Sequence, residues 1–356
     1  MTEASPKFLI SGYYGHNNFG DEAILSVVVA QLKNEFEEPQ ITVISNTPKD
    51  TSLAYQVDSV YKYDFFAIIK AMSRCDMFIS GGGSLFQDVT SVKSLVYYLL
   101  LPFMAKILGK KVFIFAQGIG PLNSAFARVL TSSVLKLADG IMVRDNDSEK
   151  LLSTLGVRST VTADPVWMFD YLPQKPENDV FKLGIQLRNW KFQDDSALSR
   201  LAEAVVTNFN DVPTQIELIS LQTPQDNSIM DRFHTLLKEK GFKYDVNLRS
   251  GMDLQQTADC IASLDLMVAM RYHAGLAAAK YCVPTLLLSY DPKVSSLAQE
   301  TKLPCIPVNE MNFERLNEGI KDLIMRKDLI KTELQPISHQ KYEKAKETLL
   351  NLKRTL

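Results

Sequence analysis

An arginine and a histidine stand two residues apart in Met270-Arg271-Tyr272-His273, between an apolar, strand-like run and a helix-like run of small residues. A guanidinium can bind a carboxylate or a phosphate through two parallel hydrogen bonds. An imidazole titrates near neutral pH and is the side chain most often used as a general acid or base. We therefore predict that Arg271 binds an anion and that His273 donates a proton. The alternative is that His273 is a structural histidine.

A lysine and a second arginine also follow predicted strands. Asp291 and Pro292 fit the N-cap and the first position of a helix, which puts Lys293 in its first turn. A lysine there opposes the helix dipole, and an anionic ligand would relieve this conflict, whereas the alternative is a lysine extended into solvent. Arg144 either binds an anionic ligand or pairs with the aspartates that follow it.

Three predicted strands run into glycine-rich segments, at 12–22, 81–88 and 117–121. Glycine permits tight turns and a close approach of the backbone to a ligand, and free N–H groups at a helix start could bind an oxygen-rich ligand. Each segment alone could be a sharp turn, and helix capping alone could explain Asp21. Three of them at the same edge of a sheet favour a ligand-binding surface.

Other patterns exclude several classes of site. The sequence lacks the G-x-G-x-x-G spacing of dinucleotide sites, a Walker A loop and a G-x-S-x-G elbow. No cluster of His, Cys and Asp has the spacing of metal ligands, so we predict no metal and no cofactor. We assign no role to His234 or His339, which have charged or polar neighbours. A role for His16, which lies in the first glycine-rich segment, stays open, but its neighbours supply no partner for base catalysis.

Apolar runs of strand length alternate with helical patterns along most of the chain, which is typical of parallel sheets built from βαβ units. We expect an α/β fold of two doubly wound, Rossmann-like domains that face a cleft, similar to the GT-B glycosyltransferases. Ligands of open parallel sheets bind beyond the carboxyl ends of the strands, where the candidate residues stand. The expected parts are a first domain at 1–172, a linker at 173–182, a second domain at 183–335 and a C-terminal helix at 336–356 that could pack on the first domain.

The composition bounds the class of protein. Among 356 residues, 39 basic side chains nearly balance 41 acidic ones, which argues against a nucleic-acid partner. The four cysteines lack CxxC spacing, and we expect them to be reduced, buried thiols. The N-terminus lacks the pattern of a secretory signal, so we expect a cytoplasmic protein.

The most apolar stretch, at 95–108, is too short to span a bilayer and precedes Lys110 and Lys111. It fits a helix of the core. It also fits a helix whose apolar face touches a membrane surface beside the two lysines. The sequence leaves both interpretations open.

Five segments, in order and each at a predicted strand end, resemble the polysaccharide pyruvyl transferase family over roughly residues 8–300. The resemblance is closest to bacterial members that modify cell-wall polysaccharide precursors. It implies a GT-B-like fold, phosphoenolpyruvate as the donor, and a pyruvate ketal formed across two sugar hydroxyls. The five segments are Gly15-His-Asn-Asn-Phe-Gly-Asp-Glu22, Gly81-Gly-Gly-Ser-Leu-Phe-Gln-Asp88, Gln117-Gly-Ile-Gly-Pro121, Val143-Arg-Asp145 and Met270-Arg-Tyr-His-Ala274.

The resemblance gives the candidate residues their roles. Phosphoenolpyruvate needs a cationic pocket, which Arg144, Arg271 and Lys293 would supply from both domains, at the interdomain cleft. His273 would protonate the donor's methylene carbon; one sugar hydroxyl would attack, phosphate would leave, and a second hydroxyl would close the ring. The acceptor would meet the glycine-rich segments of the first domain. The residues expected to contact it are Tyr14, Asn18, Asp21, Gln87 and Asp88.

Two other functions stay open at this point. The same fold and the same cations would suit a GT-B-type glycosyltransferase that uses a nucleotide-sugar. A carbohydrate-binding protein without catalysis would keep the sites and release no phosphate. If the acceptor is lipid-linked, the stretch at 95–108 becomes a candidate for peripheral contact with the inner face of the cytoplasmic membrane.

Overall fold

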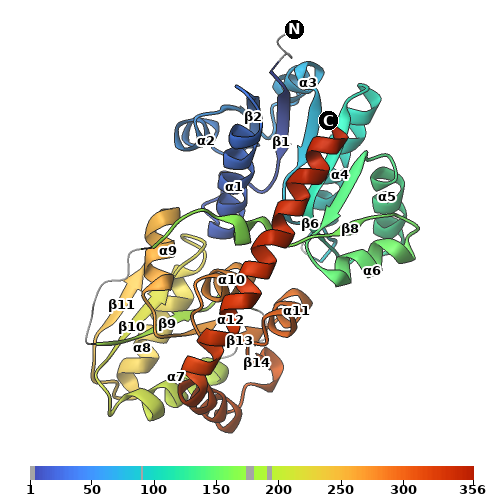
Figure 1. Ribbon diagram of the computed structural model, residues 1–356. Coiled ribbons are helices and arrows are strands. Elements are labelled where there is room, and N and C mark those ends of the chain that lie inside the picture. The colour runs from blue at the N-terminus through green and yellow to red at the C-terminus, as the bar shows by residue number, and fades with distance from the viewer. Residues whose placement is uncertain (1–4, 90, 174–179, 191–194) are drawn as a thin grey trace. The chain divides into compact units, whose positions relative to one another are not determined.

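The computed structural model of the chain describes residues 5–89, 91–173, 180–190 and 195–356 (Figure 1). The chain forms two compact units, Met1–Asp170 with Lys341–Leu356, and Tyr171–Gln340. Each unit is an open parallel sheet covered by helices on both faces, so the predicted α/β fold of two doubly wound domains is confirmed. Of the proposed linker at 173–182, residues 174–179 lie outside the described residues, and its last two residues, from Phe181, already belong to the first strand of the second unit.

The first sheet has the strand order β3-β2-β1-β4-β6-β7-β8, with β5 paired to β6. All of its strand pairs are parallel, and the order reverses direction between β1 and β4, which is therefore the topological switch point. The interiors of β1, β4 and β6 are buried and almost wholly apolar, as strands covered on both faces should be. The strands are β1 (Lys7–Ser11), β2 (Gln40–Ser45), β3 (Asp58–Tyr61), β4 (Met77–Ser80), β5 (Gly83–Phe86), β6 (Lys111–Ile119), β7 (Gly140–Val143) and β8 (Thr160–Val161).

Short polar side chains begin most helices of the first unit. Asn18, Asp64, Ser91, Ser124 and Asp145 each accept a hydrogen bond from a backbone N–H of the first turn, which satisfies a donor that the helix leaves open. The helices are α1 (Phe19–Glu35), α2 (Pro48–Tyr55), α3 (Phe65–Arg74), α4 (Val92–Ile107), α5 (Ala125–Leu135), α6 (Asn146–Thr154) and the 3-10 turn η1 (Pro165–Met168).

The direction of the chain places these helices on two faces of the first sheet. From β1 to β3 each crossover moves one way, and from β3 to β8 each moves the other way. Right-handed crossovers therefore put α1 and α2 on one face, and α3, α4, α5 and α6 on the opposite face. One hydrophobic cluster joins buried residues of α3, α4 and α5 to the sheet beneath them.

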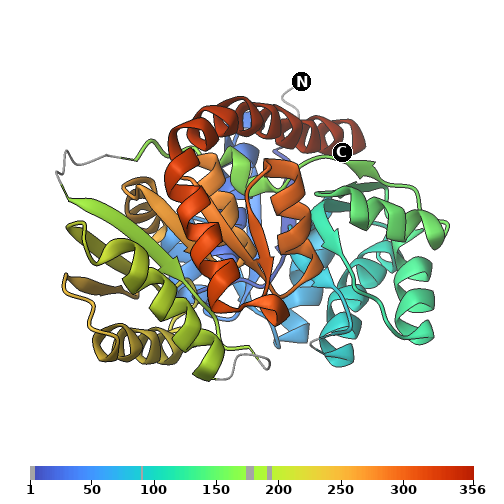
Figure 2. The same cartoon turned by 90° about the horizontal axis from the view of Figure 1, so that it is seen from below.

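The second sheet has the strand order β11-β10-β9-β12-β13-β14, with its switch point between β9 and β12. Its strands are β9 (Phe181–Gln186), β10 (Thr214–Ile219), β11 (Val246–Arg249), β12 (Leu266–Ala269), β13 (Thr285–Ser289) and β14 (Cys305–Pro307). Helices α7 and α8 pack side by side on one face (Figure 1 and Figure 2). The helices are α7 (Asp195–Phe209), α8 (Asn227–Glu239), α9 (Leu254–Ala262), α10 (Tyr272–Lys280), α11 (Pro292–Thr301), α12 (Phe313–Thr355) and the 3-10 turn η2 (Val308–Glu310).

The long helix α12 begins in the second unit and ends in the first. The proposed separate helix at 336–356 is the continuation of α12. In the first unit Thr348 Oγ1 donates to Thr162 Oγ1, and Lys353 pairs with Glu35 of α1. Leu349 and Leu352 are buried there. The end of α12 therefore packs on the face of the first sheet that carries α1.

The four cysteines are free thiols, but only Cys75 is buried. Cys260, Cys282 and Cys305 are partly exposed, so the prediction that all four are buried was wrong for three of them. Within the described residues, no helix is both long and apolar enough to cross a membrane.

Candidate functional site

The second unit brings a cationic group to the carboxyl edge of its sheet, at the switch point. Arg188 follows β9, and Arg271 follows the neighbouring strand β12. Gln186, the last residue of β9, accepts a hydrogen bond at Oε1 from the backbone N–H of Arg271, at 2.7 Å. This contact fixes the two strand ends to each other, in the position where open sheets bind ligands.

A buried ion pair fixes the side chain of Arg271. Its Nε donates to Asp226 Oδ2 at 2.8 Å, and its Nη2 donates to Asp226 Oδ1 at 2.5 Å. Nη2 also donates to Gln222 Oε1 at 3.0 Å. The Arg271 side chain is 12% exposed and that of Asp226 is 1% exposed. The pair therefore restrains the carboxyl edge of the second sheet. Asp226 was not among the predicted site residues, because it lies 45 residues before its partner.

Arg188 is a second cation that the sequence analysis missed. Its Nη1 donates to the hydroxyl of Tyr290 at 2.8 Å, and its guanidinium carbon lies 4.8 Å from the centre of that ring. The ring of Trp190 lies 5.5 Å away from the same carbon. Arg188 Nε is buried and has no hydrogen-bond partner among the described residues. Its position directly after a predicted strand was the signal that could have found it.

His273 and Lys293 lie in the first turns of two helices that start at this edge. His273 is the second residue of α10, partly buried, with its ring against that of Tyr272 at 5.0 Å. The predicted start of α11 is confirmed, since Asp291 caps it, Pro292 begins it, and Asp291 Oδ1 accepts from the Lys293 N–H. Lys293 Nζ lies 3.5 Å from Asp291 Oδ2, so Asp291 partly offsets the unfavourable dipole in this structure.

In the first unit the glycines around the switch point make room for Tyr14. A Cβ on Gly12 would lie 2.3 Å from the Tyr14 ring, and one on Gly81 would lie 2.1 Å from its hydroxyl. The phenol is 2% exposed, and burial, Asp21, Glu22 and Tyr98 raise the pKa of Tyr14 well above its usual value. The predicted contact of Tyr14 with an acceptor stays a prediction, and protein atoms cover the side chain in this structure.

The loop after β1 is held by the start of α1. Asn18 is the N-cap, whereas Asp21, considered for that role, lies in the first turn and accepts from Asn18 Nδ2 at 2.6 Å. Glu22 accepts from the Gly15 N–H at 2.8 Å and from the Tyr55 hydroxyl at 2.9 Å. Burial raises the pKa of Glu22, although these hydrogen bonds favour its charged form. Asn18 and Asp21 thus lie together at the predicted acceptor edge.

His16 is neutral in this loop for a physical reason. Its ring stacks on Tyr13 at 4.0 Å, and its Nε2 lies 2.8 Å from Lys62 Nζ. Burial and the charge of Lys62 lower the pKa of His16 to about 4. A base with so low a pKa carries little driving force at neutral pH, which argues against the catalytic role that the sequence left open for His16.

Gln87 and Asp88 end the second glycine-rich segment, near the first residues of α5. The Asp88 carboxylate accepts from the N–H groups of Asn123 and Ser124 at 2.8–3.0 Å. Gln87 Oε1 accepts from the Val89 N–H. Both side chains therefore organise loops, and their contact with an acceptor stays a prediction.

Arg144 is buried at the carboxyl edge of the first sheet. Its Nη1 pairs with Asp164 Oδ2 at 3.0 Å and its Nη2 donates to Ser84 Oγ at 2.8 Å. Its Nε lies 3.5 Å from Asp145, one of the aspartates considered as its partners. Gly118 leaves room for the guanidinium, because a Cβ there would lie 2.8 Å from Nε. The guanidinium links β5, the start of α6 and the start of η1, and its contact with a donor stays a prediction.

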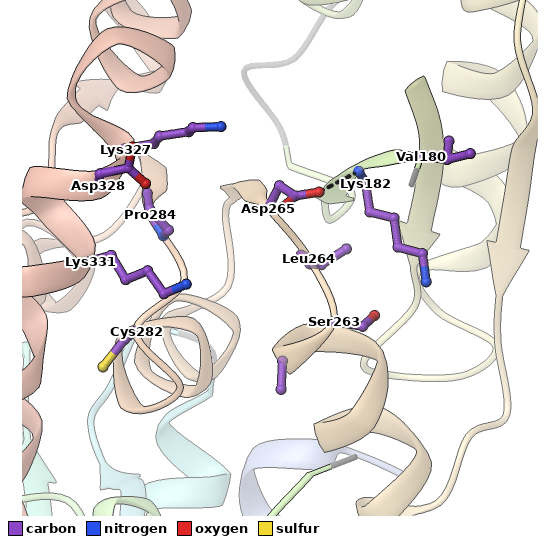
Figure 3. Close-up of a pocket in the computed structure, with 11 residues that line it drawn as sticks. Val180, Lys182, Ser263, Leu264, Asp265, Cys282, Pro284, Lys327, Asp328 and Lys331 are labelled. Carbon is purple, nitrogen blue, oxygen red and sulfur yellow. Dashed lines mark hydrogen bonds between the residues drawn. The ribbon is translucent and has the colours of Figure 1, made fainter. Parts of the chain in front are cut away.

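The cavity drawn in Figure 3 lies at the opposite edge of the second sheet, with a volume of about 220 Å³. Lys182 stands near the start of β9, and Asp265 directly precedes β12. The Asp265 carboxylate accepts from the Lys182 N–H, as Figure 3 shows. Because ligands of open sheets bind at the carboxyl ends, we do not assign the reaction to this cavity.

The side chains that could bind a metal ion are scattered over the part of the chain that the structure describes. Within it, no three or more His, Cys, Asp and Glu side chains come together in a way that could hold a metal ion. The expectation of a reaction without a metal or cofactor stays a prediction.

Solved structures share the fold of this chain at low sequence identity. The S. aureus MnaA–UDP structure is 13% identical, covers 95% of this chain and 92% of its own, and gives a TM-score of 0.67. UDP-GlcNAc 2-epimerase from Neisseria meningitidis, bound to UDP-GlcNAc, is 12% identical over 97% and 100% of the two chains, with a TM-score of 0.64. Anabaena Alr3699/HepE in complex with UDP and glucose is 13% identical over 98% and 99%, also with a TM-score of 0.64. These likenesses show a GT-B-like fold, as expected.

A search of curated protein sequences found no match. A family model, by contrast, matches residues 18–292, a span that covers most of the chain and both units. The matched span includes Arg144, Arg271 and His273 and ends one residue before Lys293. The chain therefore belongs to the polysaccharide pyruvyl transferase family.

Proposed function

We propose that the chain transfers a pyruvyl group from phosphoenolpyruvate to two hydroxyls of one sugar in a cell-wall polysaccharide precursor. The products are a cyclic pyruvate ketal and inorganic phosphate. Membership of the pyruvyl transferase family supports the transfer of pyruvyl groups to polysaccharide in general. The donor and the acceptor belong to the proposal.

The observation that carries the choice of donor is the set of cations at one sheet edge. Arg188, Arg271 and Lys293 follow β9, β12 and β13, three adjacent strands of the second sheet. Phosphoenolpyruvate has a carboxylate and a phosphate close together, so it needs several cations in a small volume. In addition, α10 and α11 both begin here, and their N-termini favour negative charge.

His273 is suited to the proton transfer that starts the reaction. It is the second residue of α10, which begins at the strand end that carries Arg271, and we place the donor's methylene carbon within reach of its imidazole. Protonation of the methylene carbon makes a methyl group and leaves the adjacent carbon electron-poor. A sugar hydroxyl attacks that carbon and loses its proton, the carbon–oxygen bond to phosphate breaks, and a second hydroxyl closes the ring with loss of its proton.

The Asp226–Arg271 pair supports the donor site by orientation. A guanidinium held through Nε and Nη2 keeps a fixed direction, so less freedom is lost when a ligand binds. The rings of Trp190 and Tyr290, which the Arg188 guanidinium contacts, orient this second guanidinium in the same way. We propose that Arg188 joins the predicted donor ligands Arg271 and Lys293.

The test is a phosphate-release assay with phosphoenolpyruvate and a panel of glycosyl acceptors, with and without a chelator. Phosphate release that requires an acceptor, together with a ketal in the product, is the expected result. Release of nucleotide from a nucleotide-sugar instead would favour the glycosyltransferase alternative, which the UDP-bound neighbours of the same fold make worth including. Sugar binding without any turnover would favour the non-catalytic alternative. Loss of activity with chelator would contradict the metal-free mechanism.

A further inference from the structure

Three helices of the first unit, α3, α4 and α5, form one continuous surface that we call the α3–α5 face. They cover the same face of the first sheet and share one hydrophobic cluster beneath them. The Tyr97 hydroxyl of α4 donates to the backbone carbonyl of Lys62, and its ring meets the ring of Tyr63, just before α3 begins. Helix α4 also packs along α5. The outer sides of the three helices therefore lie next to one another.

The outward side of α4 is apolar along its whole length. Its exposed large side chains are spaced by four, four, three and four residues, which places them on one stripe of the helix. Helices α3 and α5 add aromatic and branched side chains, of which Phe66 is the most exposed, at 89%. Monomeric proteins rarely expose contiguous apolar surface of this kind unless it binds something. The exposed apolar residues are Phe65, Phe66, Ile69, Val92, Val96, Leu100, Phe103, Ile107, Phe126 and Val129.

The charged residues within these three helices all have one sign. The three helices contain no Asp or Glu and five basic residues, Lys70, Arg74, Lys93, Lys106 and Arg128. The other helices of the same sheet, α1, α2 and α6, each carry acidic residues in the first turn. Two carboxylates flank these helices: Asp64, the N-cap of α3, accepts from the Ala67 N–H, and Asp139, in the loop after α5, pairs with Lys106. The absence of acidic side chains from three adjacent helices favours a negatively charged partner.

We propose that the α3–α5 face docks on the surface of an anionic lipid bilayer. Exposed Phe and Ile side chains enter the boundary between headgroups and acyl chains, and the lysines and arginines meet lipid phosphates. A folded protein partner of mixed charge would need acidic groups here to match its own basic ones. An anionic membrane surface needs only apolar side chains and cations, which is the combination that these helices present.

Membrane docking is inferred from the surface alone and does not depend on the proposed reaction. It does, however, bear on the acceptor of that reaction. Helices that follow parallel strands begin at the carboxyl edge, so Phe66, Val92 and Phe126, all near helix starts, lie towards the edge that carries the glycine-rich segments. A lipid-linked acceptor would remain in the bilayer and present its sugar to that edge. The membrane surface thus specifies a lipid-linked acceptor within the proposed function.

The experiment measures binding of the full chain to sedimented vesicles without any substrate, so that its result is independent of the reaction. Vesicles of phosphatidylcholine with about a third phosphatidylglycerol are compared with pure phosphatidylcholine, at about 0.1 M and about 0.5 M salt. We expect binding to the anionic vesicles only, weakened at the higher salt. No binding to anionic vesicles at low salt would overturn the proposal.

Variants locate the surface. Phe66→Ser with Ile107→Ser removes two exposed apolar groups, and Lys70→Glu with Lys93→Glu reverses two exposed charges; each pair should weaken vesicle binding at least about tenfold. The matched control is Leu53→Ser, an 83% exposed leucine of α2 on the other face of the same sheet, which should bind as the unchanged protein does. Equal loss in the control would overturn the proposal. A dimer in solution that the Phe66 and Ile107 changes dissociate would assign this face to a second copy of the chain instead.

Discussion

Replacing Asp226 by Asn tests whether the Asp226–Arg271 pair stabilises the carboxyl edge of the second sheet. Asp226 Oδ2 accepts from three donors, Arg271 Nε and the N–H groups of Leu221 and Gln222, while Oδ1 accepts from Arg271 Nη2. An amide has only one oxygen. The asparagine side chain would keep most of these hydrogen bonds by placing its oxygen at the Oδ2 position. Its NH₂ group would then face Arg271 Nη2, so that two donors meet and one hydrogen bond is lost.

The size of the effect follows from the burial of the pair. Removing one partner of a buried ion pair typically costs about 3–5 kcal/mol, because the other charge is left uncompensated. Asn keeps the shape and some hydrogen bonds, and Arg271 is 12% exposed, so we expect the lower end, about 3 kcal/mol. For a unit of this size, about 2–4 °C of melting temperature corresponds to 1 kcal/mol. The expected fall is therefore about 6–12 °C in the transition of the second unit.

Two measurements check this, calorimetry of the full chain and the KM for phosphoenolpyruvate in the phosphate-release assay. We expect KM to rise because Arg271 loses its fixed direction. The double variant Asp226→Asn with Arg271→Gln should regain part of the lost stability, since no charge is stranded. As a control, Arg326→Gln breaks an exposed pair with Asp322 on α12 and should cost less than about 1 kcal/mol. A cost for Asp226→Asn no larger than that of the control would refute the reasoning.

Four other changes test the remaining assignments. His273→Gln keeps bulk but cannot deliver a proton at neutral pH, so turnover should fall about 10²- to 10⁴-fold while donor binding persists; near-normal turnover across the pH range would make His273 only an orienting ligand. Lys293→Ala should raise the apparent KM for the donor without lowering the melting temperature. An unchanged KM would mean that Lys293 is a lysine extended into solvent and not a donor ligand. Gly118→Ala puts a Cβ 2.8 Å from Arg144 Nε and should destabilise the first unit by about 1–3 kcal/mol, measured by calorimetry. Burial raises the pKa of Asp88, but hydrogen bonds from Asn123 and Ser124 outweigh it and hold that pKa below its usual value. The charged carboxylate therefore stabilises the folded state at pH values above the unfolded pKa. In a series of melting curves, Asp88→Asn should be destabilising at pH 7, and the difference should fade as the pH falls through the lowered pKa.

The sequence predicted the elements whose patterns are strong and local. The start of α11 was predicted to the residue, because Asp291 fits an N-cap and Pro292 fits the first helical position. The short edge strands β3, β11 and β14 have weak apolar patterns, because edge strands need not be buried on both faces. The start of α9, by contrast, is marked by a capping box of Asp253 and Gln256, which is a local sequence signal.

The candidate site was predictable as a set of strand ends but not as a set of contacts. Gly12 and Gly81 were interpreted as room for a ligand, whereas in the structure a side chain, Tyr14, occupies that space. Arg271 was recognised, but its partner Asp226 comes from another loop of the sheet edge, which no local pattern reveals. Arg188 was overlooked because no histidine or glycine-rich run marks it. Pairings across a sheet edge depend on strand order, and strand order is set by the packing of the whole unit.

Both units use an arginine at a strand end in the same way. Arg144 pairs with Asp164 in the first unit, and Arg271 pairs with Asp226 in the second, with each carboxylate almost fully buried. A buried pair of this kind contributes orientation more reliably than net stability. A donor dianion bound only by these guanidiniums would have to share them with their carboxylates. The cations with weaker internal partners, Arg188 on a tyrosine hydroxyl and Lys293 at 3.5 Å from Asp291, are therefore the ones that should gain most from the donor's charge. In the proposed donor site we therefore expect Arg271 to direct the donor, and Arg188 and Lys293 to neutralise its charge.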